Sequence, residues 1–268
     1  MNFQIVEKRK HYYSNLSVQF GLLRVMKDRE VVFMDRFDNW KCIRGLMIRN
    51  IQAIERFFNE FHFFEKDYNI YVSLAKYKNM PYFTTDLKER SKETLEWFKE
   101  KAKNEIYDYD IFLDFDCKND NLFKLKQEVG NIVSFLDKNN ICFSVYPSGT
   151  NYQIVIKNFN IIKLEEIKKF YDLLKEAGNL KYLDYKGCGV SEKIRKCQYS
   201  LVGETVVYPI HTTKHFIEFP YSYFDTTNIL KIEKSFHENY FNDFGDEISK
   251  KHLQLLLKKF LFYEKNEV

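Results

Sequence analysis

Asp114 and Asp116 are the residues whose type and spacing most directly suggest chemistry. They end the short apolar and aromatic run from Tyr109 to Asp116, which is typical of a buried strand. Alternate side chains of a strand point to the same face, so we expect the two Cα atoms to lie about 7 Å apart. Carboxylates held this close repel each other unless a cation lies between them, and oxygen ligands favour Mg²⁺ or Mn²⁺. The pair therefore indicates a divalent metal site, with an ordinary turn or helix cap as the alternative.

Two further features could meet this pair on one face of a sheet. Ser148 and Gly149 lie in a predicted turn, and Asp184 precedes the basic, irregular stretch 186–196. Three carboxylates around divalent metal, beside a small-residue turn and basic side chains, meet the requirements of phosphoryl transfer by two metal ions. The structural alternatives are a turn role for Asp184 and a common hairpin turn at Ser148 and Gly149.

The predicted elements around these residues alternate between strands and helices. Amphipathic helices are predicted at 121–138 and 164–177. A hairpin is predicted from strands at 141–146 and 152–156, joined by the turn 147–151. This order predicts an α+β fold with helices on one face of the sheet, of the ferredoxin-like or RNA-recognition (RRM-like) type.

The N-terminal part has its own predicted elements. Residues 11–37 contain short aromatic and β-branched pieces, and strands are predicted at 29–34 and 69–77. Helical spacing occurs at 47–64, and its apolar stripe is interpreted as core packing. Charged and amphipathic helices are also predicted at 85–103 and 246–262.

Composition places limits on the class of protein. The chain has 268 residues, 45% hydrophobic and 18% aromatic content, and a net charge of only +4. Any nucleic-acid surface must therefore be local. Cysteines stand far apart, so a structural zinc site is not expected, and their odd count suits a reduced cytoplasm. The cysteines are Cys42, Cys117, Cys142, Cys188 and Cys197. We see neither a signal peptide nor a membrane span, and expect a soluble intracellular protein.

The order of the motifs resembles the catalytic small subunit of archaeal and eukaryotic DNA primases, within the archaeo-eukaryotic primase-polymerase superfamily. Asp114-Phe115-Asp116 is similar to the first motif of the family, Ser148-Gly149 to the second, and Leu183-Asp184 to the third. Lys196 to Thr205 is similar to the segment whose basic residue binds triphosphate. Three upstream segments also resemble the family: Arg29-Glu30-Val31, Cys42-Ile43-Arg44 and Ile70 to Ser73. The resemblance covers most of the chain.

The sequence departs from the family at several positions. Gln153 stands where the second motif has a nucleotide-contacting His, and Val202 replaces a later His. Glutamine can still donate a hydrogen bond to phosphate or ribose, but it carries no charge. The Cys/His zinc cluster of many members is also missing.

The resemblance implies a primase-polymerase fold, in which an RRM-like, mostly antiparallel sheet with helices packs beside a smaller N-terminal α/β unit. We expect a single catalytic domain over residues 1–268. Its N-terminal unit would cover about 1–105 and its metal-site unit about 106–268.

The implied activity is that of a DNA primase or primase-polymerase, a nucleotidyltransferase that uses NTP or dNTP on a DNA template and primer. Asp114, Asp116 and Asp184 would be catalytic and would bind two Mg²⁺ or Mn²⁺ ions. The residues expected to bind nucleotide are Ser148, Gly149, Gln153 and Lys196, with Arg195 and Arg44 as further candidates. Lys186, Lys193 and Arg195 are candidates for template phosphates. A primase large subunit or a helicase is the implied protein partner, in a cytoplasmic, DNA-associated and membrane-free setting.

Two other functions are compatible with parts of the sequence. A non-catalytic single-stranded nucleic-acid-binding module would use an RRM-like sheet and many aromatic rings for stacking. Such a module has no reason to gather three carboxylates on a face meant for phosphate. An unrelated Asp-x-Asp enzyme acting on nucleotide sugars would not need the basic segment from Lys196 to Thr205.

Overall fold

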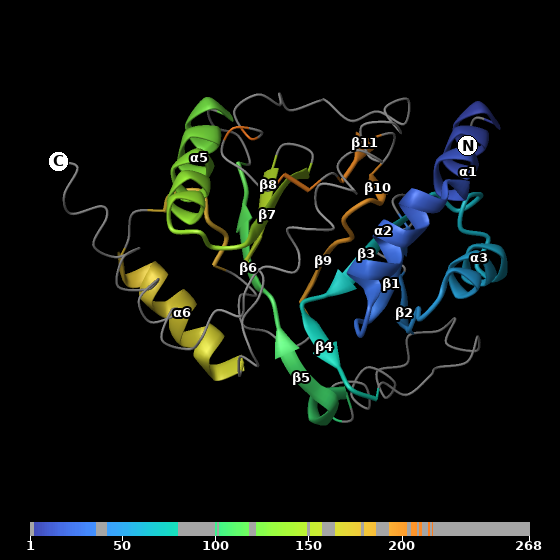
Figure 1. The fold of residues 1–268 in the computed structure, drawn as a ribbon, viewed down its shortest axis with the longest axis horizontal. Helices are drawn as coiled ribbons and strands as arrows, with labels where there is room; N and C mark the ends of the chain where they lie inside the picture. The colour runs from blue at the N-terminus through green and yellow to red at the C-terminus, as the bar shows by residue number, and fades with distance from the viewer. Residues whose placement is uncertain are drawn as a thin grey trace. The chain divides into compact units, whose positions relative to one another are not determined.

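The computed structural model has an α+β fold (Figure 1), which confirms the predicted class. It describes residues 3–35, 42–79, 100, 102–117, 122–148, 151–156, 164–177, 180–185, 193–202, 205–207, 209–210, 214 and 216. The contacts divide the chain into two compact units. Of the described residues, 3–107 and 193–207 belong to the first unit, and 108–185 and 209–216 to the second. The predicted helix at 246–262 and most of that at 85–103 lie outside the described residues.

The first unit is built on a four-stranded antiparallel sheet. Its strand order is β2 (Cys42–Leu46), β1 (Val31–Asp35), β3 (Tyr68–Ser73) and β9 (Ile194–Lys196). β9 falls within the stretch 106–268 that we expected in the other unit, but its antiparallel pairing with β3 makes it part of the first. Two short pairs of strands are also present: β10 (Leu201–Val202) with β11 (Thr205–Val206), and β4 (Ala75–Tyr77) with β5 (Ile106–Tyr109), of which residues 106–107 belong to this unit.

Three helices belong to the first unit, and two of them were not predicted. The end of α1 (Phe3–Ser14) and all of α2 (Leu16–Met26) lie within 11–37, where we expected short aromatic and β-branched pieces, so that expectation is wrong there. α1 buries the charged residue Arg9, which forms an ion pair with the distant Asp67 and hides the helical pattern. α3 (Ile51–Glu60) confirms the predicted helix, and the Asn50 side chain caps it by accepting from the Ala53 N–H at 2.8 Å.

The second unit contains a three-stranded antiparallel sheet of order β6 (Ile111–Phe115), β8 (Asn151–Ile156) and β7 (Phe143–Ser148). Helices α5 (Leu122–Lys138) and α6 (Leu164–Ala177) confirm both predicted helices, and in Figure 1 both lie to the left of these strands. The predicted hairpin is confirmed, but its strands run further toward the turn than expected, because pairing continues to Ser148 and Asn151. Pro147 is tolerated since β7 is an edge strand of this sheet.

Phe216 shows which face of the second sheet α5 covers. Its ring contacts Tyr152 of β8 at a centroid distance of 5.5 Å, and Lys126 of α5 lies over it at 5.9 Å. Tyr152 pairs with Phe115 and shares its face of the sheet. α5 therefore packs on the face that carries Phe115.

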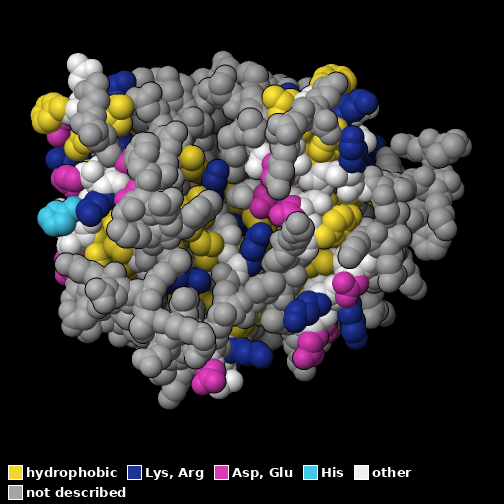
Figure 2. All heavy atoms as spheres, turned by 180° about the vertical axis from the view of Figure 1, so that it is seen from behind, with side chains coloured by type: hydrophobic (Ala, Val, Ile, Leu, Met, Phe, Trp, Pro, Cys, Tyr) yellow, Lys and Arg dark blue, Asp and Glu magenta, His cyan; other side chains and the backbone are white. Residues whose placement is uncertain are grey.

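On the face seen in Figure 2, the described side chains are mixed in character. Figure 2 shows Lys and Arg side chains spread among hydrophobic and acidic ones on the visible face. Among the described helices, none has both the length and the apolar character needed to cross a bilayer.

Candidate active site

A short antiparallel bridge brings the three predicted aspartates together. Leu183 pairs with Phe115. The Asp184 N–H donates to the Asp114 carbonyl at 2.7 Å, and the Asp116 N–H donates to the Tyr182 carbonyl at 2.9 Å. Residues that lie opposite each other on paired strands share a face, with Cβ atoms about 5 Å apart. Asp184 thus lies beside Asp114, and Asp116 is two residues further along the same face.

The local sequence explains why the carboxylates share this face. Leu113, Phe115 and Leu183 alternate with the aspartates along the two segments and are 0%, 0% and 5% exposed. The aspartates themselves are half-buried. Because the strand period is two, burying the apolar residues under α5 directs Asp114, Asp116 and Asp184 to the opposite face.

Gln153 joins the same group. The register pairs it with Asp114 on one side and with Tyr146 on the other. Its Nε2 donates to Asp114 Oδ1 at 3.2 Å, and the residue is 7% exposed. Its Oε1 is buried and has no hydrogen-bond partner among the described residues. The amide N–H of Gln153 therefore holds the Asp114 carboxylate, and its amide oxygen Oε1 has no hydrogen-bond partner among the described residues.

The second-motif turn is only partly described. Ser148 pairs with Asn151 at the end of the hairpin, in step with the pairing of Tyr146 and Gln153. Position 148 is two residues after Tyr146 on β7, so it falls on the same face of the sheet as Gln153 and Asp114. Its side chain and the whole of Gly149 lie outside the described residues.

The donor set of this face fits a divalent cation. Three carboxylates are the hard oxygen ligands that Mg²⁺ and Mn²⁺ take, and Gln153 Oε1 is a buried oxygen without a partner. Within the described residues, no three His, Cys, Asp or Glu side chains lie close enough together in this structure to hold an ion. The fit thus rests on the backbone pairing, which leaves the carboxylates within reach of one another by rotation of their side chains.

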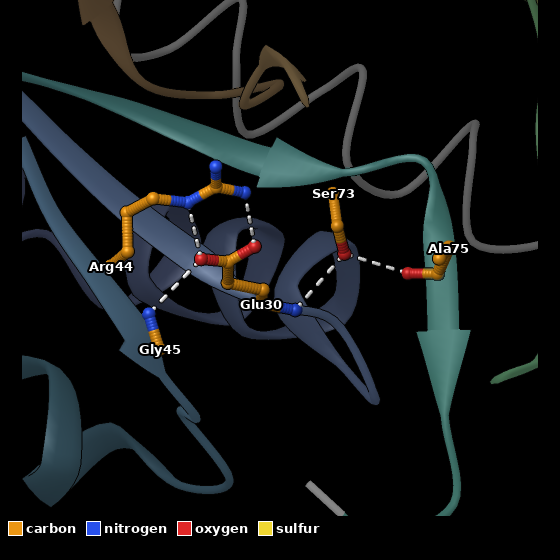
Figure 3. A network of polar contacts seen from close by, with 5 residues as sticks. All are labelled: Glu30, Arg44, Gly45, Ser73 and Ala75. Atoms are coloured by element: carbon orange, nitrogen blue, oxygen red, sulfur yellow. Dashed lines mark hydrogen bonds and ion pairs between the residues drawn. The ribbon is translucent and has the colours of Figure 1, made fainter. Parts of the chain in front are cut away.

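Arg44 has a partner inside the first unit (Figure 3). Its Nε and Nη2 each donate to Glu30 at 2.8 Å, and the Gly45 N–H donates to Glu30 Oε1 at 3.0 Å. Glu30 is 0% exposed. The register between β1 and β2 shifts here, and Gly45 has a φ of 78°, the geometry of a β-bulge. The bulge lets Arg44 reach across to Glu30.

Lys196 and Arg195 are neighbours on β9 and point to opposite faces of the first sheet. Lys196 pairs with Tyr71 and is half-buried, whereas Arg195 pairs with Val72 and is 3% exposed. Burial raises the pKa of Tyr71. Of the two basic residues, Lys196 is the one that a ligand in solvent can reach. Lys186 lies outside the described residues.

No family model and no curated protein matches the sequence. Among solved structures, the chain is similar to the polymerase domain of Mycobacterium tuberculosis ligase D in complex with DNA. The TM-score is 0.58 with 11% identity, and the match covers 84% of this chain and 87% of that one. The chain has a polymerase-domain fold. At this identity the likeness concerns the fold alone, and it agrees with the predicted primase-polymerase type of architecture.

Two residues of this polymerase-domain fold were not singled out from the sequence. The Tyr171 hydroxyl bonds to both the N–H and the carbonyl of Phe112 on the edge of β6. The Glu128 carboxylate accepts from two consecutive backbone N–H groups, those of Lys181 and Tyr182. Each contact joins residues more than 50 positions apart. Both residues lie on amphipathic helices, where the sequence offers no signal for such a partner.

Proposed function

We propose that the chain is the catalytic domain of a primase or primase-polymerase, covering residues 1–268. It would transfer a nucleotidyl group from NTP or dNTP onto a strand templated by DNA. One observation carries the proposal: in a chain with a polymerase-domain fold, the pairing of Leu183 with Phe115 brings Asp184 opposite Asp114.

Asp114, Asp116 and Asp184 would hold Mg²⁺ or Mn²⁺ in this proposal. When bound, such ions lower the pKa of the attacking hydroxyl and neutralise the triphosphate. The chain's own contribution is to hold the three carboxylates on a rigid sheet, with Gln153 fixing Asp114 through its amide. A fixed ligand set needs little reorganisation when the reaction begins.

Basic and small residues would hold the phosphates. Lys196 is the preferred phosphate-binding residue because it is accessible, whereas Arg195 is buried and Arg44 is paired with Glu30. A lysine stabilises negative charge that develops on a leaving pyrophosphate. Ser148, Gly149 and Gln153 are proposed to contact the nucleotide near the carboxylates.

The proposed partners are DNA and nucleotides in an intracellular setting. The ligase D polymerase domain was solved in complex with DNA, which supports a DNA template and primer for this chain. A separate primase large subunit or helicase is the proposed protein partner.

A non-catalytic binding module is the weaker candidate. Stacking of single-stranded bases needs exposed aromatic rings on the sheet. On the aspartate face of the second unit, the rings of Tyr146 and Tyr182 are 0% and 7% exposed. They are therefore inaccessible to bases, whereas the half-buried carboxylates can be reached by a cation.

A strand-synthesis assay tests the proposal. Purified protein is incubated with Mn²⁺ or Mg²⁺, single-stranded or primed DNA templates, and NTPs or dNTPs. We expect metal-dependent products that disappear in the Asp114→Ala/Asp116→Ala double variant, and the unprimed template reports whether the protein starts strands. Products of equal yield from the double variant would contradict the assigned site. Single-strand binding without any product would favour the binding module.

A further inference from the structure

The segment that carries Asp184 pairs with the sheet over a short stretch. Residues 180–185 contribute an isolated bridge rather than a full strand, and that bridge is the pairing of Leu183 with Phe115. Burial of Leu183 favours the observed register, but a single residue pair supports it through the backbone. A slip of one residue would turn Asp184 toward the core and Leu183 toward the carboxylate face, because strand side chains alternate.

Glu128 supplies a second attachment for this segment. Its Oε1 accepts from the Tyr182 N–H at 3.0 Å, and its Oε2 accepts from the Lys181 N–H at 3.1 Å. Both oxygens of one carboxylate are thus used on consecutive backbone groups. Two hydrogen bonds from one side chain to consecutive backbone groups restrict both the position and the orientation of that backbone. The contact therefore fixes the backbone immediately before Leu183.

The helix that carries Glu128 is itself firmly anchored. The neighbours Val129, Ile132 and Val133 are 0%, 4% and 0% exposed. α5 packs on the face of the sheet opposite the aspartates, and Glu128 reaches the segment from α5 through one exposed bond, to Lys181, and one half-buried bond, to Tyr182. Gln127, the preceding residue, is exposed and belongs to the solvated face of the helix.

The contact also defines where the pairing with β6 ends. The Tyr182 carbonyl accepts from the Asp116 N–H at 2.9 Å. In a regular antiparallel ladder the Tyr182 N–H would donate back to the Asp116 carbonyl. Here that N–H donates to Glu128. At this end the pairing stops with Tyr182 opposite Asp116, in the register that sets Asp184 opposite Asp114 and puts all three carboxylates on one face.

We propose that Glu128 is a positioning residue for the third carboxylate of the metal site. It holds the backbone of Lys181 and Tyr182, sets the register of the bridge and so keeps Asp184 beside Asp114. This inference rests on the proposed function for the part that Asp184 plays in metal binding. The clamp on the backbone stands on the geometry alone.

Two readouts separate the clamp from the metal site. The first is amide hydrogen exchange of residues 181–185, and the second is Mn²⁺ affinity measured by electron paramagnetic resonance without nucleotide or DNA. Glu128→Ala is compared with Glu128→Gln, which keeps the side-chain size and one acceptor oxygen. Gln127→Ala, on the exposed side of the same helix, is the matched control.

For Glu128→Ala we expect at least tenfold faster exchange of the Tyr182 and Asp184 amides, because their protection depends on the local clamp. Mn²⁺ affinity should fall about 10- to 100-fold, the range for residues that orient metal ligands. Glu128→Gln should lie between wild type and Glu128→Ala, and it answers the question if the alanine variant does not fold. Gln127→Ala should match wild type in both readouts.

A double-mutant cycle decides whether Glu128 acts through Asp184. Once Asp184→Ala has lowered the Mn²⁺ affinity, adding Glu128→Ala should lower it no further. Additive losses would overturn positioning through Asp184, and unchanged exchange in both Glu128 variants would overturn the clamp. If Asp184→Ala leaves the Mn²⁺ affinity unchanged, the proposed metal site fails, while the exchange data still decide the clamp.

Discussion

Breaking the ion pair between Arg44 and Glu30 from one side should strongly destabilise the first unit. Arg44→Ala removes both guanidinium bonds and leaves a carboxylate that is 0% exposed with the Gly45 N–H as its remaining donor among the described residues. Removing one member of a buried pair costs about 3–5 kcal/mol. Because the Gly45 bond remains and the Arg44 side chain is 20% exposed, we expect the lower end, about 3 kcal/mol.

This loss is measurable by urea denaturation of purified variants. In thermal denaturation, a loss of about 3 kcal/mol corresponds to a fall of about 6–12 °C in Tm for a chain of this size. The matched control is Arg56→Ala, which breaks a solvent-exposed pair with Glu60 at 3.0 Å. An exposed pair at this helical spacing contributes only about 0.3–0.5 kcal/mol.

The charge itself is tested by a second comparison. Arg44→Met should cost about as much as Arg44→Ala. The double variant Glu30→Gln/Arg44→Met should recover much of that loss, because it no longer buries an unpaired charge. If Arg44→Ala and Arg56→Ala destabilise the protein equally, within about 1 kcal/mol, the assignment of a strong buried ion pair is refuted.

Two further predictions follow from buried groups. Tyr171→Phe should cost about 1–3 kcal/mol in urea denaturation, because the Phe112 N–H, which donates to the hydroxyl at 2.9 Å, loses its partner in a buried setting; a variant as stable as wild type would show that the edge of β6 does not need this cap. Burial raises the pKa of Cys197 to about 12, so only about one thiol in 10⁴ is ionised at pH 8. The thiolate is the reactive form. Native protein should therefore be labelled by iodoacetamide at the half-buried Cys142 well before Cys197, and equal labelling rates would contradict the burial of Cys197.

The second unit could be predicted closely from the sequence because its signals are local. The helical period of 122–138 and the alternation of Leu113, Asp114, Phe115 and Asp116 specify their elements without long-range information. The hairpin from Phe143 to Ile156 follows from turn residues between apolar runs.

The first unit was harder to predict because distant partners decide its local structure. The buried side of α1 includes Arg9, whose burial depends on Asp67 and on the Tyr68 carbonyl at 2.6 Å. A sequence pattern treats such a residue as exposed, so the helical stripe is obscured.

The details of the candidate site depend on register. The sequence shows that Lys196 and Arg195 are adjacent, but only the pairing of β9 with β3 shows which of them is accessible. The contact of Glu128 could not be predicted from the sequence either, since a glutamate on an amphipathic helix is usually solvated. Its role emerges only once 180–185 is seen beside α5.

The central claim is that Asp184 completes a catalytic metal site with Asp114 and Asp116. It is tested most directly by the rate of single-nucleotide incorporation on a primed DNA template with Mn²⁺, comparing wild type with Asp184→Asn. Asp172→Asn, at an exposed position of α6, is the matched control. We predict a rate at least about 100-fold lower for Asp184→Asn, since even residues that only orient ligands cost 10- to 100-fold, and an unchanged rate for the control. An Asp184→Asn rate within about threefold of an active wild type would contradict the account.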